Sequence, residues 1–316
     1  MKTTQLLNYY RGQWTPGDGP LTDLASAIDG SVVARTGSGG LNFKRMLDHA
    51  RTVGGPALRK MTFHERARML KGLGLAVMAR KEELYALNYA TGATRKDGWI
   101  DIEGGALTLL SFSSKGRREL PDAQVLLDGQ LEQLGKSGQF VGQHIFTSLQ
   151  GAAVHINAFN FPVWGMLEKL APTLLAGVPA IVKPASSTAF LTEAAFRVMI
   201  DSGLLPDGAV QLIVGGVGDL FDHLGGQDVV SFTGSAATAS KLKNHPVVLR
   251  ESVRFVAEQD SLNASLLGPD AAPGTPEFDL FVREVVNEMT AKAGQKCTAI
   301  RRAMAPAAHL DAVETA

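Results

Sequence analysis

Short β-rich segments alternate with helical segments from residue 151 onward, and this alternation restricts the fold more than any other feature of the sequence. The expected strands are residues 152–158, 180–183, 210–214, 229–232 and 253–257. The expected helices between them lie near residues 164–177, 187–203, 218–225 and 236–245. Repeated β–α alternation with glycine-rich strand exits is typical of a doubly wound, largely parallel sheet. We therefore predict an α/β fold.

The segments outside this alternating region have different patterns. Residues 41–118 have helical periodicity, whereas residues 120–150 contain Pro, Gly and Gln with short alternating apolar positions, which predicts a hairpin or another extended excursion. Residues 263–267 predict a strand, and residues 276–293 predict a long amphipathic helix that leads to Cys297.

Composition and charge exclude several classes of partner. Lys and Arg together number 31, as do Asp and Glu, so no excess of charge points to nucleic acid or to an anionic membrane. The N-terminus has no apolar core of a secretory signal, and the longest apolar stretch, residues 174–182, is too short to cross a bilayer. Because a free thiol suits a reducing compartment, we expect a cytoplasmic protein.

Cys297 is the single cysteine of the chain, so it cannot form an internal disulfide. No Cys/His cluster near it suggests a metal site. A lone cysteine is more often a buried structural thiol than a nucleophile. A cysteine hydrolase would need a paired histidine, but none of the seven histidines stands in a matching motif.

Three polar residues stand at expected strand ends, where each has an ordinary structural interpretation. Asn160 precedes a helix start and could cap it, whereas Lys183 and Glu258 could simply face solvent. Two glycine-containing turns also follow strands. Residues 232–235 (Phe232, Thr233, Gly234 and Ser235) lead into a helix, so their N–H groups could face a pyrophosphate. The turn around Gly216 is a weaker sign, because glycine turns between strands and helices are common.

These residues, in this order, resemble the aldehyde dehydrogenase family. The resemblance rests on Asn157-Ala158-Phe159-Asn160-Phe161-Pro162, Phe232-Thr233-Gly234-Ser235, Glu258 and Cys297. It implies that Cys297 is the nucleophile and that Glu258 is the general base that activates water. It also implies that Asn160 and the N–H of Cys297 form an oxyanion hole, in which one donor typically contributes about 3–4 kcal/mol.

The resemblance also implies a dinucleotide cofactor. Lys183 matches the family's ribose-binding lysine, and Phe232, Thr233, Gly234, Ser235 and Gly216 match its other contacts. Members that prefer NAD often have Glu three residues after this lysine, where the present chain has Ser186. A hydroxyl leaves room for a 2′-phosphate, so we expect NADP, with NAD tolerated. A second family glycine is replaced by Ala239.

A closer resemblance points to one branch of the family, because Gln259-Asp260-Ser261 follows Glu258 where most members have Leu-Gly-Gly. It extends over residues 61–67, 91–95, 99–105, 154–162 and 292–302. This branch oxidises the CoA semialdehyde of phenylacetate catabolism, 3-oxo-5,6-dehydrosuberyl-CoA semialdehyde. A sister branch, which stays open, acts on 3,4-dehydroadipyl-CoA semialdehyde in benzoate catabolism.

The resemblance finally implies a division into domains. Residues 1–119 and 151–262 would form the nucleotide-binding domain, residues 120–150 an oligomerisation hairpin, and residues 263–316 the start of an incomplete catalytic domain. The family continues well past the cysteine. In the family, the segment that matches residues 120–150 and a later strand contact a neighbouring subunit, so the resemblance implies that the longer form is a homo-oligomer. We expect residues 1–316 alone to bind nucleotide weakly and to oxidise aldehydes negligibly, which keeps an inactive nucleotide-binding fragment open as an alternative.

Overall fold

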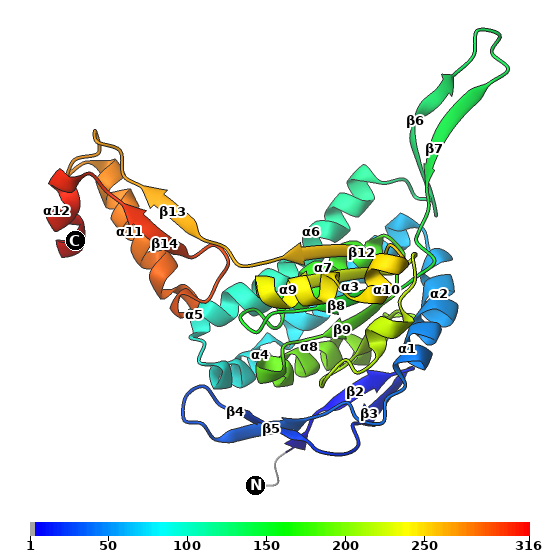
Figure 1. Cartoon of the computed structure of the whole chain (residues 1–316), viewed down its shortest axis with the longest axis horizontal. Helices are drawn as coiled ribbons and strands as arrows, with labels where there is room; N and C mark the ends of the chain where they lie inside the picture. Colours follow the sequence, from blue (N-terminus) through cyan, green and yellow to red (C-terminus); the bar gives the residue numbers. More distant parts are fainter. Residues whose placement is uncertain (1–3) are drawn as a thin grey trace. The chain divides into compact units, whose positions relative to one another are not determined.

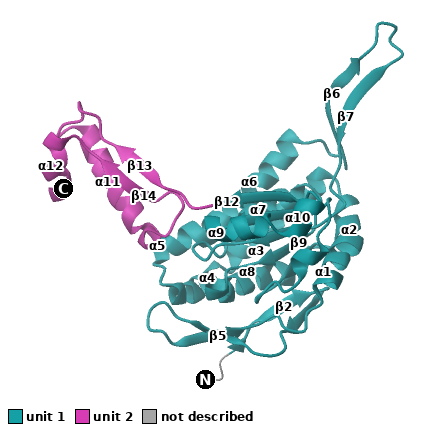
Figure 2. Ribbon diagram, in the orientation of Figure 1, with its two compact units in different colours: residues 1–258 teal, residues 259–316 magenta. Residues whose placement is uncertain are grey.

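The computed structural model describes residues 4–316, which form two compact units (Figure 2). The first unit ends at Glu258 and the second comprises Gln259–Ala316. The sequence-based division placed residues 259–262 with the first domain, whereas here they belong to the second unit. The reason is local, because strand β12 ends at Glu258 and the Ser261 hydroxyl hydrogen-bonds to the backbone of Cys297.

A seven-stranded sheet organises the first unit (Figure 1), with the strand order β12-β11-β8-β9-β10-β2-β3. Neighbouring strands from β12 to β10 run parallel, and β2 and β3 add to the β10 edge in antiparallel pairs. The strands are β2 (Leu7–Tyr10), β3 (Gln13–Pro16), β8 (Ala153–Ile156), β9 (Ala180–Lys183), β10 (Val210–Leu212), β11 (Val229–Thr233) and β12 (Arg254–Glu258). The predicted parallel α/β sheet is therefore confirmed.

Helices cover both faces of this sheet, as alternating side chains on the strands require. On β9, Ala180 and Val182 join the core under the helices α3, α6, α7 and α8, whereas Ile181 joins the opposite core with α1 and α10. The long helices are α3 (Phe63–Ala79), α6 (Gly104–Glu119), α7 (Trp164–Leu175) and α8 (Ala189–Asp201). The shorter ones are α1 (Phe43–His49), α2 (Gly55–Arg59), α4 (Lys81–Asn88), α5 (Arg95–Gly98), α9 (Ala236–Lys243) and α10 (Pro246–Arg250).

One expected helix of the sheet region is much shorter than predicted. Residues 218–225 contain only the single 3₁₀ turn η5 (Leu220–His223). Gly218 before the turn has a φ of +47°, and Gly225 and Gly226 follow it, so helical backbone is interrupted on both sides.

Arg66 on α3 joins the ends of α2 and α7, and within residues 4–316 its guanidinium forms no ion pair. Its side chain is fully buried, and its guanidinium donates to the backbone carbonyls of Leu58, Met61 and Leu175. Burial lowers the pKa of Arg66 to about 10. These bonds satisfy carbonyl groups at the ends of α2 and α7, which would otherwise be buried without partners.

The segment 120–150 contains an antiparallel hairpin, as predicted, of β6 (Leu126–Gln133) and β7 (Val141–Phe146). Its two strands pair only with each other, and large apolar side chains on both are exposed: Leu127, Leu131, Val141, Ile145 and Phe146. Its role in subunit contact stays a prediction. A further small sheet contains β1 (Thr4–Gln5), β4 (Thr22–Ala25) and β5 (Val32–Thr36).

The second unit has a small core of its own. Its strands β13 (Asn263–Leu266) and β14 (Ile300–Met304) are parallel, and the helices are α11 (Pro276–Thr290) and α12 (Leu310–Thr315). Leu267, Ala271, Phe278 and Phe281 form the buried cluster. The predicted strand and long helix before Cys297 are thus both present. Across residues 4–316, no helix is both long and apolar enough to span a membrane.

Candidate active site

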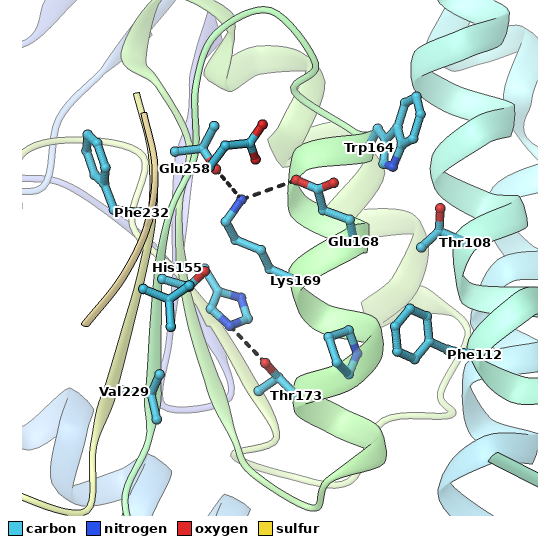
Figure 3. Close-up of a pocket in the computed structure, with 14 residues that line it drawn as sticks. Thr108, Phe112, His155, Trp164, Glu168, Lys169, Thr173, Val229, Phe232 and Glu258 are labelled. Carbon is cyan, nitrogen blue, oxygen red and sulfur yellow. Dashed lines mark hydrogen bonds and ion pairs between the residues drawn. The ribbon is translucent and has the colours of Figure 1, made fainter. Parts of the chain in front are cut away.

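A cavity of about 610 Å³ lies in the first unit, between the helices α6 and α7 and the strands β11 and β12 (Figure 3). The predicted residues Phe232, Thr233 and Glu258 line it. The other lining residues were not singled out from the sequence: Thr108, Phe112, His155, Trp164, Glu168, Lys169, Pro172, Thr173, Val229, Ser231 and Val256. One wall is therefore helical and partly aromatic, and the other is part of one face of the sheet, formed by β8, β11 and β12.

Glu258 and Thr233 stand side by side at the carboxyl ends of two paired strands. They are register partners in the parallel pair β11–β12, and the N–H of Gly234 donates to the Glu258 carbonyl at 3.1 Å. Glu258 is exposed, whereas Thr233 is half-buried. Ligands of open α/β sheets bind at this carboxyl edge, so the position of Glu258 suits a residue that acts on a bound molecule.

Lys169 on α7 extends its ammonium group to this strand edge (Figure 3). Its side chain is almost fully buried, and its Nζ lies 2.7 Å from Thr233 Oγ1 and 3.3 Å from Glu168 Oε1. Burial raises the pKa of Glu168, and the nearby charge of Glu258 adds to this, although Lys169 opposes both. The sequence signal was a Glu–Lys pair within the otherwise apolar face of α7, which sequence reasoning missed.

His155 on β8 is fully buried in the cavity wall, and its ring hydrogen-bonds to Thr173 Oγ1 at 3.1 Å. Burial, together with the charge of Lys169, lowers the pKa of His155 to about 3. The imidazole is therefore neutral at physiological pH and adds no positive charge to the cavity.

Asn160 lies half-buried in the loop between β8 and α7. Capping was its ordinary interpretation, but the first N–H groups of α7 are taken by another side chain. Asp101 Oδ1 accepts from the N–H of Val163 at 3.1 Å and of Trp164 at 2.8 Å. Thr192 also holds this loop, through a 2.9 Å bond to the Pro162 carbonyl. The cap is thus supplied from a distant segment, so capping does not require Asn160.

Lys183 and Ser186 lie where a nucleotide would meet the carboxyl end of β9. Lys183 is the last residue of that strand and is half-buried, and this burial lowers the pKa of its amine. Within residues 4–316 its side chain makes no hydrogen bond or ion pair. Ser186 is half-buried in the 3₁₀ turn η4 (Ser186–Thr188). An unpaired, partly desolvated cation at a strand end fits an anionic ligand.

The turn after β11 has two structural constraints. A Cβ on Gly234 would lie 2.7 Å from the ring of Phe232, so this close packing requires glycine. The Ser235 hydroxyl caps α9 by accepting from the N–H of Thr238 at 3.3 Å. Ala239, which replaces a family glycine, is buried on the inner face of α9. The predicted strand-to-helix turn is therefore present.

Gly216 lies exposed in the loop after β10, and a Cβ there would meet nothing within 4 Å. Its neighbours are more constrained, because a Cβ on Gly215 would lie 2.5 Å from the Ser38 nitrogen and one on Gly218 2.5 Å from the Phe43 ring. The loop therefore needs glycine at these two positions for packing, whereas Gly216 leaves open space above the backbone. The role of Gly216 in binding a cofactor stays a prediction.

Cys297 belongs to the second unit and is exposed in the turn between η6 (Ala291–Gly294) and β14. The side chains of Ser261 and Asn263 both donate to its backbone carbonyl. Just before the turn, Lys292 and Ala293 have φ values of +53° and +52°, which are strained for residues with side chains. An exposed thiol on a strained, anchored turn does not match a buried structural cysteine.

The predicted residues thus lie in several places. Phe232, Thr233 and Glu258 line one cavity, and Gly234 and Ser235 form the turn after β11. Asn160 follows β8, Lys183 ends β9 with Ser186 just after it, Gly216 follows β10, and Cys297 belongs to the other compact unit. Within residues 4–316, no group of three or more His, Cys, Asp or Glu side chains is arranged to hold a metal ion.

Comparisons with known proteins identify the family. Residues 14–315 match the aldehyde dehydrogenase family. The chain is 46% identical over 304 residues to a 3,4-dehydroadipyl-CoA semialdehyde dehydrogenase of Aromatoleum evansii, covering 96% of this chain and 59% of that protein. It is 28% identical over 303 residues to an alpha-ketoglutarate semialdehyde dehydrogenase of Haloferax volcanii, covering 94% of this chain and 59% of that protein.

Solved structures share the fold. A 3,6-anhydro-L-galactose dehydrogenase in complex with NAP superposes with a TM-score of 0.85 at 21% identity, covering 99% of this chain and 63% of that one. The present chain therefore spans about three fifths of the length of these proteins. With a family match over nearly its whole length and a relative at 46% identity, the chain belongs to the aldehyde dehydrogenase family.

Proposed function

We propose that the protein oxidises a CoA-linked semialdehyde to the carboxylic acid with NAD(P)⁺. The observation that carries this proposal is Glu258, which stands on a cavity at the carboxyl edge of the parallel sheet in a chain of this family. A carboxylate at this place can take a proton from water. Exposed Cys297 supplies the nucleophile.

In the proposed reaction, Cys297, Asn160 and Glu258 have separate roles. The Cys297 thiolate attacks the aldehyde carbon, and the Asn160 carboxamide with the Cys297 N–H stabilises the negative charge that develops on oxygen. A bound dinucleotide would supply the hydride acceptor, and loss of the hydride from the adduct would leave an acyl thioester on Cys297. Glu258 then takes a proton from water as that water attacks the thioester, and the free acid leaves the regenerated thiol.

The residues at the sheet edge fit a dinucleotide. Lys183 offers a cation without a partner among residues 4–316, Gly216 leaves space above the backbone, and α9 starts three residues after Thr233 at the same edge. Helix N-termini and unpaired cations are typical phosphate partners. These features support NAD(P) as the cofactor of the proposed reaction.

For the substrate, the 46% identical relative supports the benzoate-type alternative better than the phenylacetate-type substrate. That relative is named for 3,4-dehydroadipyl-CoA semialdehyde, so we propose this compound, or a CoA semialdehyde of similar length, as the substrate. Both candidate compounds pair an aldehyde with a CoA thioester. They differ in the length of the chain that links these groups, in the position of its double bond, and in a 3-oxo group that only the phenylacetate-type compound has.

An assay of nicotinamide reduction with both CoA semialdehydes tests this function. It is run on residues 1–316 and on a chain extended to the length of the relatives, since residues 1–316 alone are expected to oxidise aldehydes negligibly. We expect the benzoate-type compound to be oxidised with the higher kcat/KM, with one acid formed per reduced cofactor. Nucleotide binding without reduction of cofactor by either aldehyde would support the alternative of a nucleotide-binding fragment. Faster oxidation of the phenylacetate-type compound would reverse the substrate assignment but keep the reaction class.

We propose NADP as the preferred form of the cofactor, because Ser186 puts a hydroxyl where a carboxylate would repel a 2′-phosphate. Replacing Ser186 with Glu should weaken NADP binding by about tenfold or more, since a like charge close to the phosphate costs at least about 1.4 kcal/mol at low local dielectric. NAD binding should change less. Titration of the protein with each dinucleotide measures both constants.

The matched control is Ser187→Glu, which adds the same charge at the exposed neighbouring position. It should alter the NADP to NAD ratio much less than Ser186→Glu. Tighter binding of NAD than of NADP to the unmodified protein would contradict the assignment.

A further inference from the structure

The ammonium group of Lys169 is shared between α7 and the strand edge, and Glu258 has no part in this sharing. Lys169 Nζ donates to Thr233 Oγ1 at 2.7 Å and pairs with Glu168 Oε1 at 3.3 Å. Within the described chain, Lys169 forms its ion pair with Glu168 and none with Glu258. Glu258 is nevertheless close, because it is the register partner of Thr233 and lines the same cavity.

Few charged residues line the cavity around the Lys169 ammonium group. Glu168 and Lys169 come from α7, and Glu258 comes from β12. His155 on β8 is neutral because burial suppresses its protonation, and α6 contributes only Thr108 and Phe112 to the lining. Among the residues that line this cavity, one cation therefore faces two carboxylates. When the Lys169 ammonium pairs with one carboxylate, the other is left without an ion pair.

A general base must be ionised and must also keep enough basicity to take a proton from water. An ammonium group directly paired with a carboxylate lowers the pKa of that carboxylate by about 1–3 units, and so weakens it as a base. The flexible stem of Lys169 could turn its ammonium from Thr233 toward Glu258, because these two residues occupy adjacent positions on paired strands. Glu168 offers the ammonium a competing partner on its own helix.

We propose that Glu168 is a positioning residue for the proposed base: it holds the Lys169 ammonium on the α7 side and so keeps the Glu258 carboxylate unpaired. This inference rests on the proposed role of Glu258. Glu168 touches no reacting atom, and its effect passes through Lys169. Its partial burial strengthens the pair, because fewer waters compete for either charge.

A double-mutant cycle tests the inference by the pKa of Glu258, measured by NMR titration of ¹³C-labelled glutamate side chains. The Glu258 signal is assigned by its loss in Glu258→Gln. Glu168→Gln removes the competing charge but keeps the side-chain size, so the pKa of Glu258 should fall by about one unit. In a Lys169→Met background the same substitution should lower it much less, since no ammonium is left to redirect.

Two control variants distinguish redirection of the Lys169 ammonium from the general effect of removing a carboxylate. Glu82→Gln removes a carboxylate that pairs with Arg95 outside the cavity, and it should leave the pKa of Glu258 unchanged. Glu168→Asp keeps the charge on a shorter side chain, so it should restore part of the pKa of Glu258. Circular dichroism confirms that each variant is folded before its titration is compared.

An unchanged or raised pKa of Glu258 in Glu168→Gln would overturn the inference. An equal fall with and without Lys169 would also overturn it, because the effect would then be direct repulsion between two carboxylates. These outcomes are independent of the proposed function. If Glu258→Gln hydrolyses its thioester at the normal rate, the role of Glu258 as a base fails whatever the titration shows.

Discussion

In a chain extended to the length of the relatives, Cys297→Ala should abolish aldehyde oxidation, with a fall in kcat of at least about 10⁴-fold, because alanine can form neither the tetrahedral adduct nor the thioester. The same substitution should remove all labelling by iodoacetamide, since Cys297 is the single cysteine of the chain. In the unmodified protein, mass spectrometry should find one carbamidomethyl group. Its exposure in the turn before β14 makes the thiol accessible to this reagent.

The rate of labelling reports on the ionisation of the Cys297 thiol, whereas the extent of labelling reports only that the thiol is accessible. Bound NADP brings a positively charged ring, which favours the thiolate, so alkylation should become faster with the oxidised cofactor. Thr298→Ala alters the exposed neighbour and should keep both labelling and activity. Aldehyde oxidation that survives in Cys297→Ala, or a thiol that iodoacetamide does not modify in the folded protein, would contradict the nucleophile assignment.

The sheet could be predicted from the sequence because its strands are short, apolar and bounded by glycine. Ala180–Lys183 and Val229–Thr233 are continuous β-rich runs, as expected for parallel strands covered on both faces. The helices that follow β8 and β9 have equally clear apolar periodicity, as in Trp164–Leu175. Local pattern and tertiary packing agree there, whereas the helix expected at residues 218–225 is only a 3₁₀ turn because glycines flank it.

The antiparallel edge of the sheet could not be predicted in the same way. The strands β2 and β3 are four residues each and contain polar residues such as Asn8 and Gln13. Asn8 is buried because its side chain hydrogen-bonds to the backbone of Gly37 and Val214, far away in sequence. No local pattern contains that information, because the partners come together only in the folded chain.

Only part of the candidate site could be predicted from the sequence, again because some contacts form only in the folded chain. Glu258 and Thr233 follow apolar strands, so their place at the sheet edge was readable from the sequence. Lys169 lies in the middle of a helix, and its importance appears only when α7 packs against β11 and brings its Nζ to Thr233. The N-terminus of α7 is a similar case, because its N–H groups are capped by Asp101, which lies 62 residues before Val163 in the chain.

Glu258→Gln should separate the two halves of the reaction, and this gives the second large effect. Hydride transfer needs Cys297 and the oxyanion donors, but it does not need water, so one equivalent of reduced cofactor should form at nearly the normal rate. Thioester hydrolysis should then slow by about 10²–10⁴-fold, because glutamine cannot accept a proton from the attacking water. Rapid mixing measures the burst, and intact mass spectrometry should detect the acyl group on the protein.

Three comparisons make this result specific to the loss of a base at position 258. Glu251→Gln removes an exposed carboxylate that lies outside the cavity, and it should turn over normally. Hydroxylamine attacks thioesters without help from a base, so adding it to Glu258→Gln should release the acyl group and restore repeated turnover. Peptide mapping should place the trapped acyl group on Cys297. Steady turnover of Glu258→Gln at the unmodified rate would show that another group activates the water, and a loss of the burst itself would assign Glu258 to the first half of the reaction instead.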